Sequence, residues 1–273
     1  MLDEATPTPI AQIQELRVEF QTQDGPVLGV ENVSFDINAG ETVCVVGESG
    51  SGKSVSSLSL MRLVEFGGGK IAGGRLLFER QNDPAVDLAR TDQDVMRDIR
   101  GNEIGMIFQD PMTALNPVLR VGEQIEEVLN MHSDLSRAEA KARTIDMMEQ
   151  VHLPDVERIY AAFPHQLSGG QRQRIMIAMA LILDPDLLIA EEPTTALDVT
   201  TQLQILKLIS EMQERHGTAV LFITHDMGVV AEIADTVSVM QKGRIVESAP
   251  IRQLLTAPKE DYTRKLLQAV PNL

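Results

Sequence analysis

The stretch Gly47-Glu48-Ser49-Gly50-Ser51-Gly52-Lys53-Ser54 decides the fold of this chain. The apolar run Thr42–Val46 precedes it and residues 54–64 have helical spacing, which predicts a strand, a loop and a helix. The glycines let backbone N–H groups converge on phosphate oxygens at the start of that helix. Lys53 can reach the β- and γ-phosphates of a nucleotide, and Ser54 can ligate Mg²⁺. The stretch therefore predicts a phosphate-binding loop.

Strands and helices alternate through the second half of the chain, which predicts a parallel sheet. We expect strands at residues 104–108, 187–190, 219–224 and 236–241, and helices at residues 170–183, 200–215 and 227–234.

Two other regions depart from that alternation. Residues 13–20 and 30–37 alternate in hydropathy around the turn-forming residues 23–26, which predicts antiparallel strands. Residues 118–161 have helical periodicity and predict an inserted helical subdomain. The expected organisation is one α/β domain over residues 10–260, with a helical subdomain at about 112–168 and a tail at 261–273.

Composition limits the function. The formal net charge of −16 disfavours nucleic acid and anionic lipid as direct partners. No stretch approaches the roughly 20 apolar residues of a membrane-spanning helix, and the first 14 residues lack the pattern of a secretory signal, so we expect a soluble, cytoplasmic protein. The single cysteine, Cys44, lies in an apolar run and is expected to be a buried strand thiol.

Two carboxylates follow the apolar strand at 187–190. Glu191 and Glu192 would emerge at the carboxyl edge of a parallel sheet, where ligands bind in such folds. The first can hold Mg²⁺ or its water ligands, and the second can polarise a water that attacks the γ-phosphate. Two surface glutamates at a strand end are the alternative interpretation.

Further motifs resemble the ABC ATPase family over nearly the whole chain. Leu167-Ser168-Gly169-Gly170-Gln171 looks like the family's signature, and residues 191–198, with the sequence EEPTTALD, follow it at the expected place. Gln109 resembles the Q-loop glutamine, a metal and catalytic residue, and His225 resembles the switch histidine. The resemblance implies a P-loop NTPase fold with an N-terminal antiparallel β subdomain, a RecA-like parallel core and an inserted helical subdomain.

The resemblance also implies how the site is completed. Two such domains stack head to tail, so that Ser168, Gly169, Gly170 and Gln171 close over the ATP of the other domain. Asp198 then communicates across the interface. Phe20 matches the family's adenine-stacking aromatic by position, although a strand phenylalanine in the core is the other interpretation.

Within the family, residues 47–55, 108–117 and 164–170 resemble the dipeptide, oligopeptide and glutathione importers, and residues 262–271 resemble the tail motif of that group. This implies ATP and Mg²⁺ as ligands, permease subunits and a second ABC ATPase domain (identical, homologous or fused) as partners, and an extracytoplasmic peptide-binding protein as an indirect partner. The implied location is the cytoplasmic face of the bacterial inner membrane.

One residue departs from the family pattern. Aspartate is usual at the position of Glu191, so two alternatives remain: a working motor with a tolerated variant, or a catalytically impaired regulatory subunit. An ABC ATPase of DNA maintenance is a third class, but it normally carries long coiled coils or zinc modules, whose patterns are absent from this sequence. With one cysteine, we expect no iron–sulfur cluster.

Overall fold

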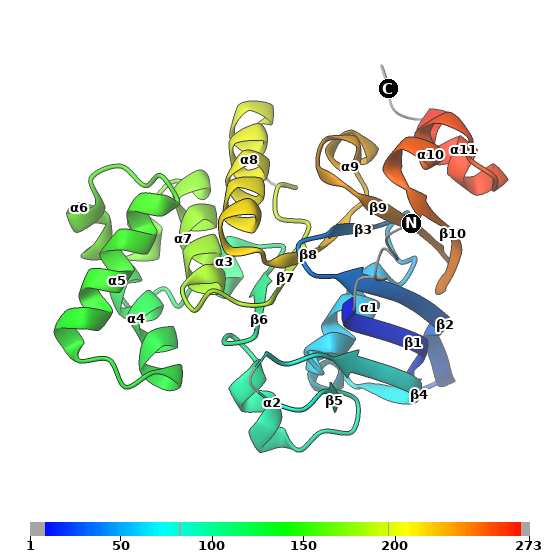
Figure 1. Ribbon diagram of the computed structural model, residues 1–273, viewed down its shortest axis with the longest axis horizontal. Coiled ribbons are helices and arrows are strands. Elements are labelled where there is room, and N and C mark those ends of the chain that lie inside the picture. The colour runs from blue at the N-terminus through cyan, green and yellow to red at the C-terminus, as the bar shows by residue number, and fades with distance from the viewer. Residues whose placement is uncertain (1–8, 82, 196, 269–273) are drawn as a thin grey trace, which may run out of the picture. The chain divides into compact units, whose positions relative to one another are not determined.

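The computed structural model describes residues 9–81, 83–195 and 197–268 (Figure 1). Ala196 of the 191–198 motif and Val270-Pro271 of the tail motif lie outside the described residues. The chain divides into two compact units. The described parts of Met1–Arg97 and Gly217–Leu273 form one, called here the terminal unit, and Asp98–His216 form the other, called the central unit.

The terminal unit contains an antiparallel sheet. Its strands are β1 (Pro9–Thr22), β2 (Gly25–Asn38), β4 (Gly69–Phe78) and β5 (Val86–Asp87), in the order β2-β1-β4-β5. The predicted antiparallel pair at 13–20 and 30–37 is therefore confirmed, with longer strands that pair from Pro9 with Asn38 to Thr22 with Gly25.

A second set of strands in the terminal unit carries the phosphate loop. These strands are β3 (Thr42–Val46), β8 (Ala219–Thr224), β9 (Thr236–Gln241) and β10 (Arg244–Pro250), in the order β10-β9-β3-β8. β3 runs parallel to both β8 and β9, and every residue of β3 and β8 is buried. Strands covered on both faces need no polar alternation, which is why they are continuous apolar runs. The Cys44 thiol is buried as predicted, and burial raises its pKa.

The helices of the terminal unit include α1 (Lys53–Leu60), α9 (Met227–Ile233), α10 (Ile251–Thr256) and α11 (Asp261–Gln268). The helix predicted over 54–64 ends early, because Arg62 has a left-handed backbone (φ 50°) and the 3₁₀ turn η1 (Leu63–Gly67) follows. The short helix α2 (Gln93–Ile99), the strand β10 and the two C-terminal helices were not predicted.

The central unit has two parallel strands, β6 (Ile104–Ile107) and β7 (Leu187–Glu191). Its helices follow in chain order, the earlier ones drawn in green in Figure 1: α3 (Pro111–Ala114), α4 (Val121–His132), α5 (Arg137–Gln150), α6 (Val156–Tyr160), the 3₁₀ turn η2 (Pro164–Gln166), α7 (Gly169–Leu181) and α8 (Val199–His216). The helices between β6 and α7 confirm the inserted helical subdomain, whereas its limits at 112 and 168 stay a prediction.

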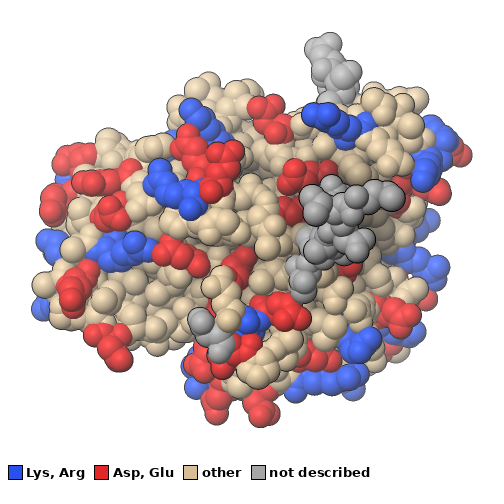
Figure 2. Space-filling view, viewed as in Figure 1, with Lys and Arg blue, Asp and Glu red and all other residues tan. Residues whose placement is uncertain are grey.

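No helix within 9–81, 83–195 and 197–268 is both long enough and apolar enough to cross a membrane. Figure 2 shows acidic side chains distributed over the visible face, with basic side chains between them.

Candidate functional site

The phosphate loop joins β3 to α1 in the terminal unit. Gly47 leaves β3 with φ 153°, and a Cβ there would lie 2.1 Å from the carbonyl oxygen of Met240 on β9, so only glycine fits. Gly52 has a left-handed backbone (φ 105°) and begins α1 without a side-chain cap. The first turn of α1 has no acidic residue. Its N–H groups are thus free of any capping side chain, which suits an anion.

Lys53 is drawn into the loop. Its side chain is buried, and its Nζ donates hydrogen bonds to the carbonyl oxygens of Gly47 (2.8 Å) and Glu48 (2.9 Å). The hydroxyl of Ser51 is also buried and makes no hydrogen bond within the described residues. A buried hydroxyl without a partner is costly, and a phosphate oxygen in the loop would relieve that cost.

His225 lies at the same sheet edge as the phosphate loop. In the parallel pair β3 and β8, Val46 is opposite Thr224, so Gly47 and His225 leave neighbouring strands side by side. His225 is exposed, and the next residue, Asp226, caps α9 by accepting the N–H of Gly228 (2.8 Å). This cap and a hydrogen bond from the Asp226 N–H to Thr224 Oγ1 (3.0 Å) fix the turn that presents His225.

Phe20 lies near the end of β1 and is half-buried. Its ring packs against two glycines: a Cβ at Gly29 would lie 2.6 Å from the ring, and a Cβ at Gly69 would lie 2.9 Å from it. The ring thus combines a packed edge with partial exposure.

Gln109 and Glu192 meet in the central unit. The parallel pair β6 and β7 places Ile107 opposite Ala190, so both residues follow strand ends at one edge. Gln109 Nε2 donates to Glu192 Oε2 at 3.0 Å, and Thr195 Oγ1 donates to the same oxygen at 2.9 Å. Glu192 has a positive φ of 42°, a strained conformation for a residue with a side chain. Strain of this kind concentrates at functional sites, where the surrounding structure holds it.

Glu191 ends β7 with a buried side chain, 8% exposed, whereas Glu192 is half-buried. The two carboxylates therefore have different surroundings. A buried carboxylate can hold a cation and a more accessible one can contact water, and the two roles stay predictions.

The signature residues begin α7. Ser168 is the N-cap: its Oγ accepts the N–H of Gln171 (3.3 Å), and Gln171 Oε1 accepts the N–H of Ser168 (3.0 Å). In this capping box the Ser168 hydroxyl oxygen accepts one hydrogen bond, and the hydroxyl hydrogen stays available to donate. Ser168 and Gly169 are exposed, and a Cβ at Gly169 would meet no other atom. An exposed helix N-terminus with a free hydroxyl donor can receive a phosphate.

Asp198 begins α8 in a comparable way. It accepts hydrogen bonds from the N–H (3.0 Å) and the hydroxyl (2.7 Å) of Thr201, and these bonds lower the pKa of its carboxyl. Asp198 is exposed, so it caps a helix and remains accessible to another molecule.

Magnesium was predicted at Ser54, Gln109 and Glu191. Among the described residues no three His, Cys, Asp or Glu side chains form a metal-binding group. Mg²⁺ bound with a nucleotide needs only one or two protein ligands, because phosphates and water supply the others. Ser54 is exposed in the first turn of α1 in the terminal unit, and Gln109 and Glu191 belong to the central unit. Each of the three residues has an oxygen atom of the kind that Mg²⁺ binds.

Two contacts of the phosphate loop were missed by sequence reasoning. The hydroxyl of Tyr262 on α11 accepts the N–H of Glu48 (3.1 Å), and the N–H of Gly243 donates to the carbonyl oxygen of Ser51 (2.8 Å). Tyr262 is 214 positions from Glu48, and no local pattern reveals a contact at that separation. The only signal was that Tyr262 belongs to the tail motif.

Comparisons with known proteins agree on one family. The sequence profile described as ABC transporter matches residues 30–195. The glutathione import ATP-binding protein GsiA of Pectobacterium atrosepticum is 52% identical over 264 residues, which cover 97% of this chain and 42% of that protein. This chain thus spans less than half the length of that relative.

Two further proteins extend the comparison. A Brucella ovis protein, named provisionally as a peptide import ATP-binding protein, is 51% identical over 265 residues, covering 97% of this chain and 78% of its own length. Among solved structures, the dimeric ATP-binding cassette MJ0796 in a post-hydrolysis state with ADP and phosphate has a TM-score of 0.78 and 27% identity, covering 89% of this chain and 99% of that one.

Proposed function

Since the chain belongs to the ABC transporter family and has its P-loop ATPase fold, we propose that it binds and hydrolyses ATP to power the import of a peptide. The observation that carries the proposal is the phosphate loop, with its uncapped helix start and its buried lysine.

ATP binds at residues 47–54 in this proposal. The N–H groups around the start of α1 surround the phosphates, and Lys53 exchanges its two carbonyl partners for phosphate oxygens. Ser54, Gln109 and Glu191 would hold the Mg²⁺ that accompanies the nucleotide, and the ion supplies charge neutralisation of the phosphates when bound. Phe20 stacks on the adenine.

Hydrolysis then depends on Glu192. Its carboxylate accepts a hydrogen bond from the attacking water and takes its proton, while the water oxygen bonds to the γ-phosphorus and the bond to the β–γ bridging oxygen breaks. His225 faces the γ-phosphate and stabilises its charge. Gln109, which donates to Glu192 in this structure, keeps the carboxylate in its acceptor orientation and senses the occupied site.

A second ABC ATPase domain completes the site. Ser168, Gly169, Gly170 and Gln171 contact the γ-phosphate of the partner's ATP through the free hydroxyl hydrogen and the N–H groups at the start of α7. Asp198 carries the state of one site to the other. The dimeric state of the cassette MJ0796 supports this arrangement.

The substrate, partners and location are proposed from relatives. Import of glutathione and of peptides appears in the names of the two relatives above, so we propose a small peptide as the cargo. Permease subunits would anchor the chain at the cytoplasmic face of the inner membrane, and an extracytoplasmic peptide-binding protein would deliver the cargo to them. The cargo itself does not contact this chain.

Glu191 is the specific observation that favours a second candidate, an ATP-binding subunit with little turnover. A longer side chain than aspartate moves the carboxylate relative to the ion, and a displacement of about 1 Å can cost on the order of 100-fold in rate. We favour the working motor, because all the other expected elements are present.

The deciding experiment measures Mg-ATP turnover of the chain beside Glu191→Asp. Comparable rates support a working motor with a tolerated variant. Activity that appears only in Glu191→Asp would support the regulatory subunit instead. Lys53→Ala serves as the reference for both proteins, because it should weaken ATP binding and abolish turnover. ATP binding that is unaffected by Lys53→Ala would contradict the proposed site.

A further inference from the structure

The backbone of Glu48 is held on both sides of its Cα. Its carbonyl oxygen accepts a hydrogen bond from Lys53 Nζ (2.9 Å), and its N–H donates to the hydroxyl of Tyr262 (3.1 Å). The first contact comes from within the phosphate loop and must change when Lys53 turns to a phosphate. The second comes from the C-terminal helix α11 and can persist, so it can keep the loop in place while Lys53 moves.

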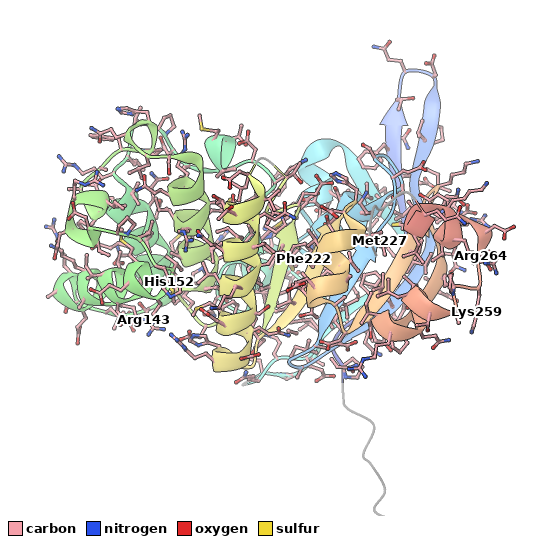
Figure 3. All side chains as sticks on the ribbon, turned by 90° about the horizontal axis from the view of Figure 1, so that it is seen from above. Arg143, His152, Phe222, Met227, Lys259 and Arg264 are labelled. Carbon is pink, nitrogen blue, oxygen red and sulfur yellow. The ribbon has the colours of Figure 1, made fainter. Side chains whose placement is uncertain are left out.

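The helix that carries Tyr262 is firmly anchored in the same unit. Glu247 on β10 accepts the N–H groups of Lys259 (2.8 Å) and Glu260 (3.1 Å), which lie just before α11. Arg264 in turn donates to the carbonyl oxygens of Pro258 (3.2 Å) and Lys259 (2.6 Å). Figure 3 labels Lys259 and Arg264 in this C-terminal segment.

These contacts form a continuous series that begins and ends at the phosphate loop. β3 leads into the phosphate loop and pairs with β9, β9 pairs with β10, and β10 anchors the turn before α11. The hydroxyl of Tyr262 then contacts the loop at the N–H of Glu48, and the N–H of Gly243, between β9 and β10, donates to the carbonyl oxygen of Ser51 (2.8 Å). A loop fixed at both its beginning and its middle loses less entropy when it closes on phosphate, because it is already ordered.

We propose that Tyr262 is a positioning residue for the phosphate loop, through which the C-terminal helix raises the affinity for nucleotide. The proposal rests on the proposed function, since it takes residues 47–54 as the phosphate site. The tail motif would thus contribute to nucleotide binding, although the residues that contact ATP lie elsewhere, at 47–54.

The test uses the full chain and Mg-ADP, titrated by calorimetry. Tyr262→Phe removes one hydroxyl and should weaken ADP binding about threefold to tenfold, the range for loss of one hydrogen bond. The matched control is Tyr160→Phe, because Tyr160 is the other of the chain's two tyrosines, and its hydroxyl donates to Glu126 in the central unit. Its ADP affinity should stay within about twofold of wild type.

A spectroscopic signature separates positioning from general stability. Labelling with 3-fluorotyrosine gives two ¹⁹F signals, which Tyr160→Phe assigns, because the one signal left in that variant belongs to Tyr262. The Tyr262 signal should shift on addition of Mg-ADP, and the Tyr160 signal should not. This measurement needs no altered protein at Tyr262, so it stands even if Tyr262→Phe folds poorly.

The outcomes are distinct. Unchanged ADP affinity in Tyr262→Phe overturns the proposal, and so does weakened affinity combined with a Tyr262 signal that ADP leaves in place. Lys53→Ala is titrated in parallel as the reference for the site. If wild type itself binds no ADP, the proposed function fails, and this result is recognised from the wild-type titration alone.

Discussion

At the scale of single residues, one oxygen atom of Glu192 has a central place in the proposed mechanism. Its Oε2 accepts hydrogen bonds from Gln109 and Thr195, while its backbone holds a positive φ of 42°. The two donors compensate for part of the negative charge of the carboxylate. In the proposed mechanism this carboxylate accepts the proton of the attacking water.

Replacing Glu192 with Gln should leave ATP binding intact and lower turnover by about 100-fold to 10,000-fold, the usual contribution of a general base. The amide keeps an oxygen that can accept from Gln109 and Thr195, so the local structure should persist. Single-turnover hydrolysis and equilibrium ATP binding, measured side by side, check both parts. Turnover at the wild-type rate would show that another group activates the water.

The phosphate loop and the strand-end carboxylates could be predicted because glycine spacing and apolar runs are local signals. The backbone conformation of Glu192 and the contact of Tyr262 could not. A left-handed glutamate has no sequence pattern, since tertiary packing imposes it. The Tyr262 contact joins residues that only the completed sheet brings together.

At the scale of elements, α4 and α6 pack through one glycine. A Cβ at Gly122 would lie 2.3 Å from Cδ2 and 2.6 Å from Cγ of Tyr160. The ring cannot easily move, because its hydroxyl donates to Glu126 and the Lys141 ammonium lies 4.9 Å from its centroid. Burial and the hydrogen bond to Glu126 raise the pKa of Tyr160 to about 12, so the hydroxyl keeps its proton at neutral pH.

Gly122→Ala should therefore lower the free energy of unfolding by about 1–2 kcal/mol, although alanine is the better helix former. The clash depends on the ring. In a Tyr160→Ala background the same change should become stabilising, by up to about 1 kcal/mol. Urea unfolding of the four proteins measures both effects, and a Gly122→Ala effect of the same sign and size in both backgrounds would contradict this account.

Glu247 anchors the turn between α10 and α11. Burial raises the pKa of its carboxyl, but the Thr263 hydroxyl and the N–H groups of Lys259 and Glu260 outweigh burial and hold the pKa below the ordinary 4.5. A lowered folded-state pKa means that the anion stabilises the fold above about pH 4.5, and that this stabilisation is lost as the pH falls through the folded-state pKa.

Glu247→Gln should accordingly lower stability by about 1–2 kcal/mol at pH 7, because one charged acceptor is lost. The gap between variant and wild type should narrow as the pH falls from 4.5 through the folded-state pKa, because the wild-type carboxyl is protonated first in the unfolded state and then in the folded state. Thermal unfolding from pH 7 down to about pH 3, a range that extends well below 4.5, checks this, with exposed Glu260→Gln as the control. A gap that stays constant over this range would show that charge is not the cause.

Elements with strong periodicity were predicted within a few residues, and the misses have physical causes. The helix after the phosphate loop ends early at the left-handed Arg62, and β10 is recognised as a strand only by pairing with β9. α11 is only eight residues long and buries only Thr263, so its placement depends more on its anchors than on its own packing.

At the scale of the whole molecule, the proposed active site requires two copies or a copy and a homologue. If the chain pairs with itself, turnover per molecule should rise with protein concentration until dimers dominate. A strictly constant specific activity from nanomolar to micromolar protein would show that its own copy does not complete the site.

Mixing two inactive variants tests the head-to-tail arrangement more directly. Lys53→Ala damages the phosphate loop of one chain, and Ser168→Ala damages the signature of the other chain. Each site combines the phosphate loop of one chain with the signature of its partner, so a mixed dimer has one site with both defects and one intact site. With random pairing and independent sites, up to about a quarter of the wild-type activity should return. A mixture of two separate preparations of Lys53→Ala is the negative control, because every site in it has a damaged phosphate loop.

β3 lies between β8 and β9, and this order has implications for the time course of biosynthesis. Roughly 170 residues separate β3 from β8 along the chain, which a ribosome adds in roughly 10 to 35 s at about 5–20 residues per second. During that interval the apolar segment Thr42–Val46 has neither of its neighbours. A nascent chain arrested before residue 219 would contain the complete phosphate-loop motif, yet we expect it to bind no nucleotide and to need shielding from aggregation.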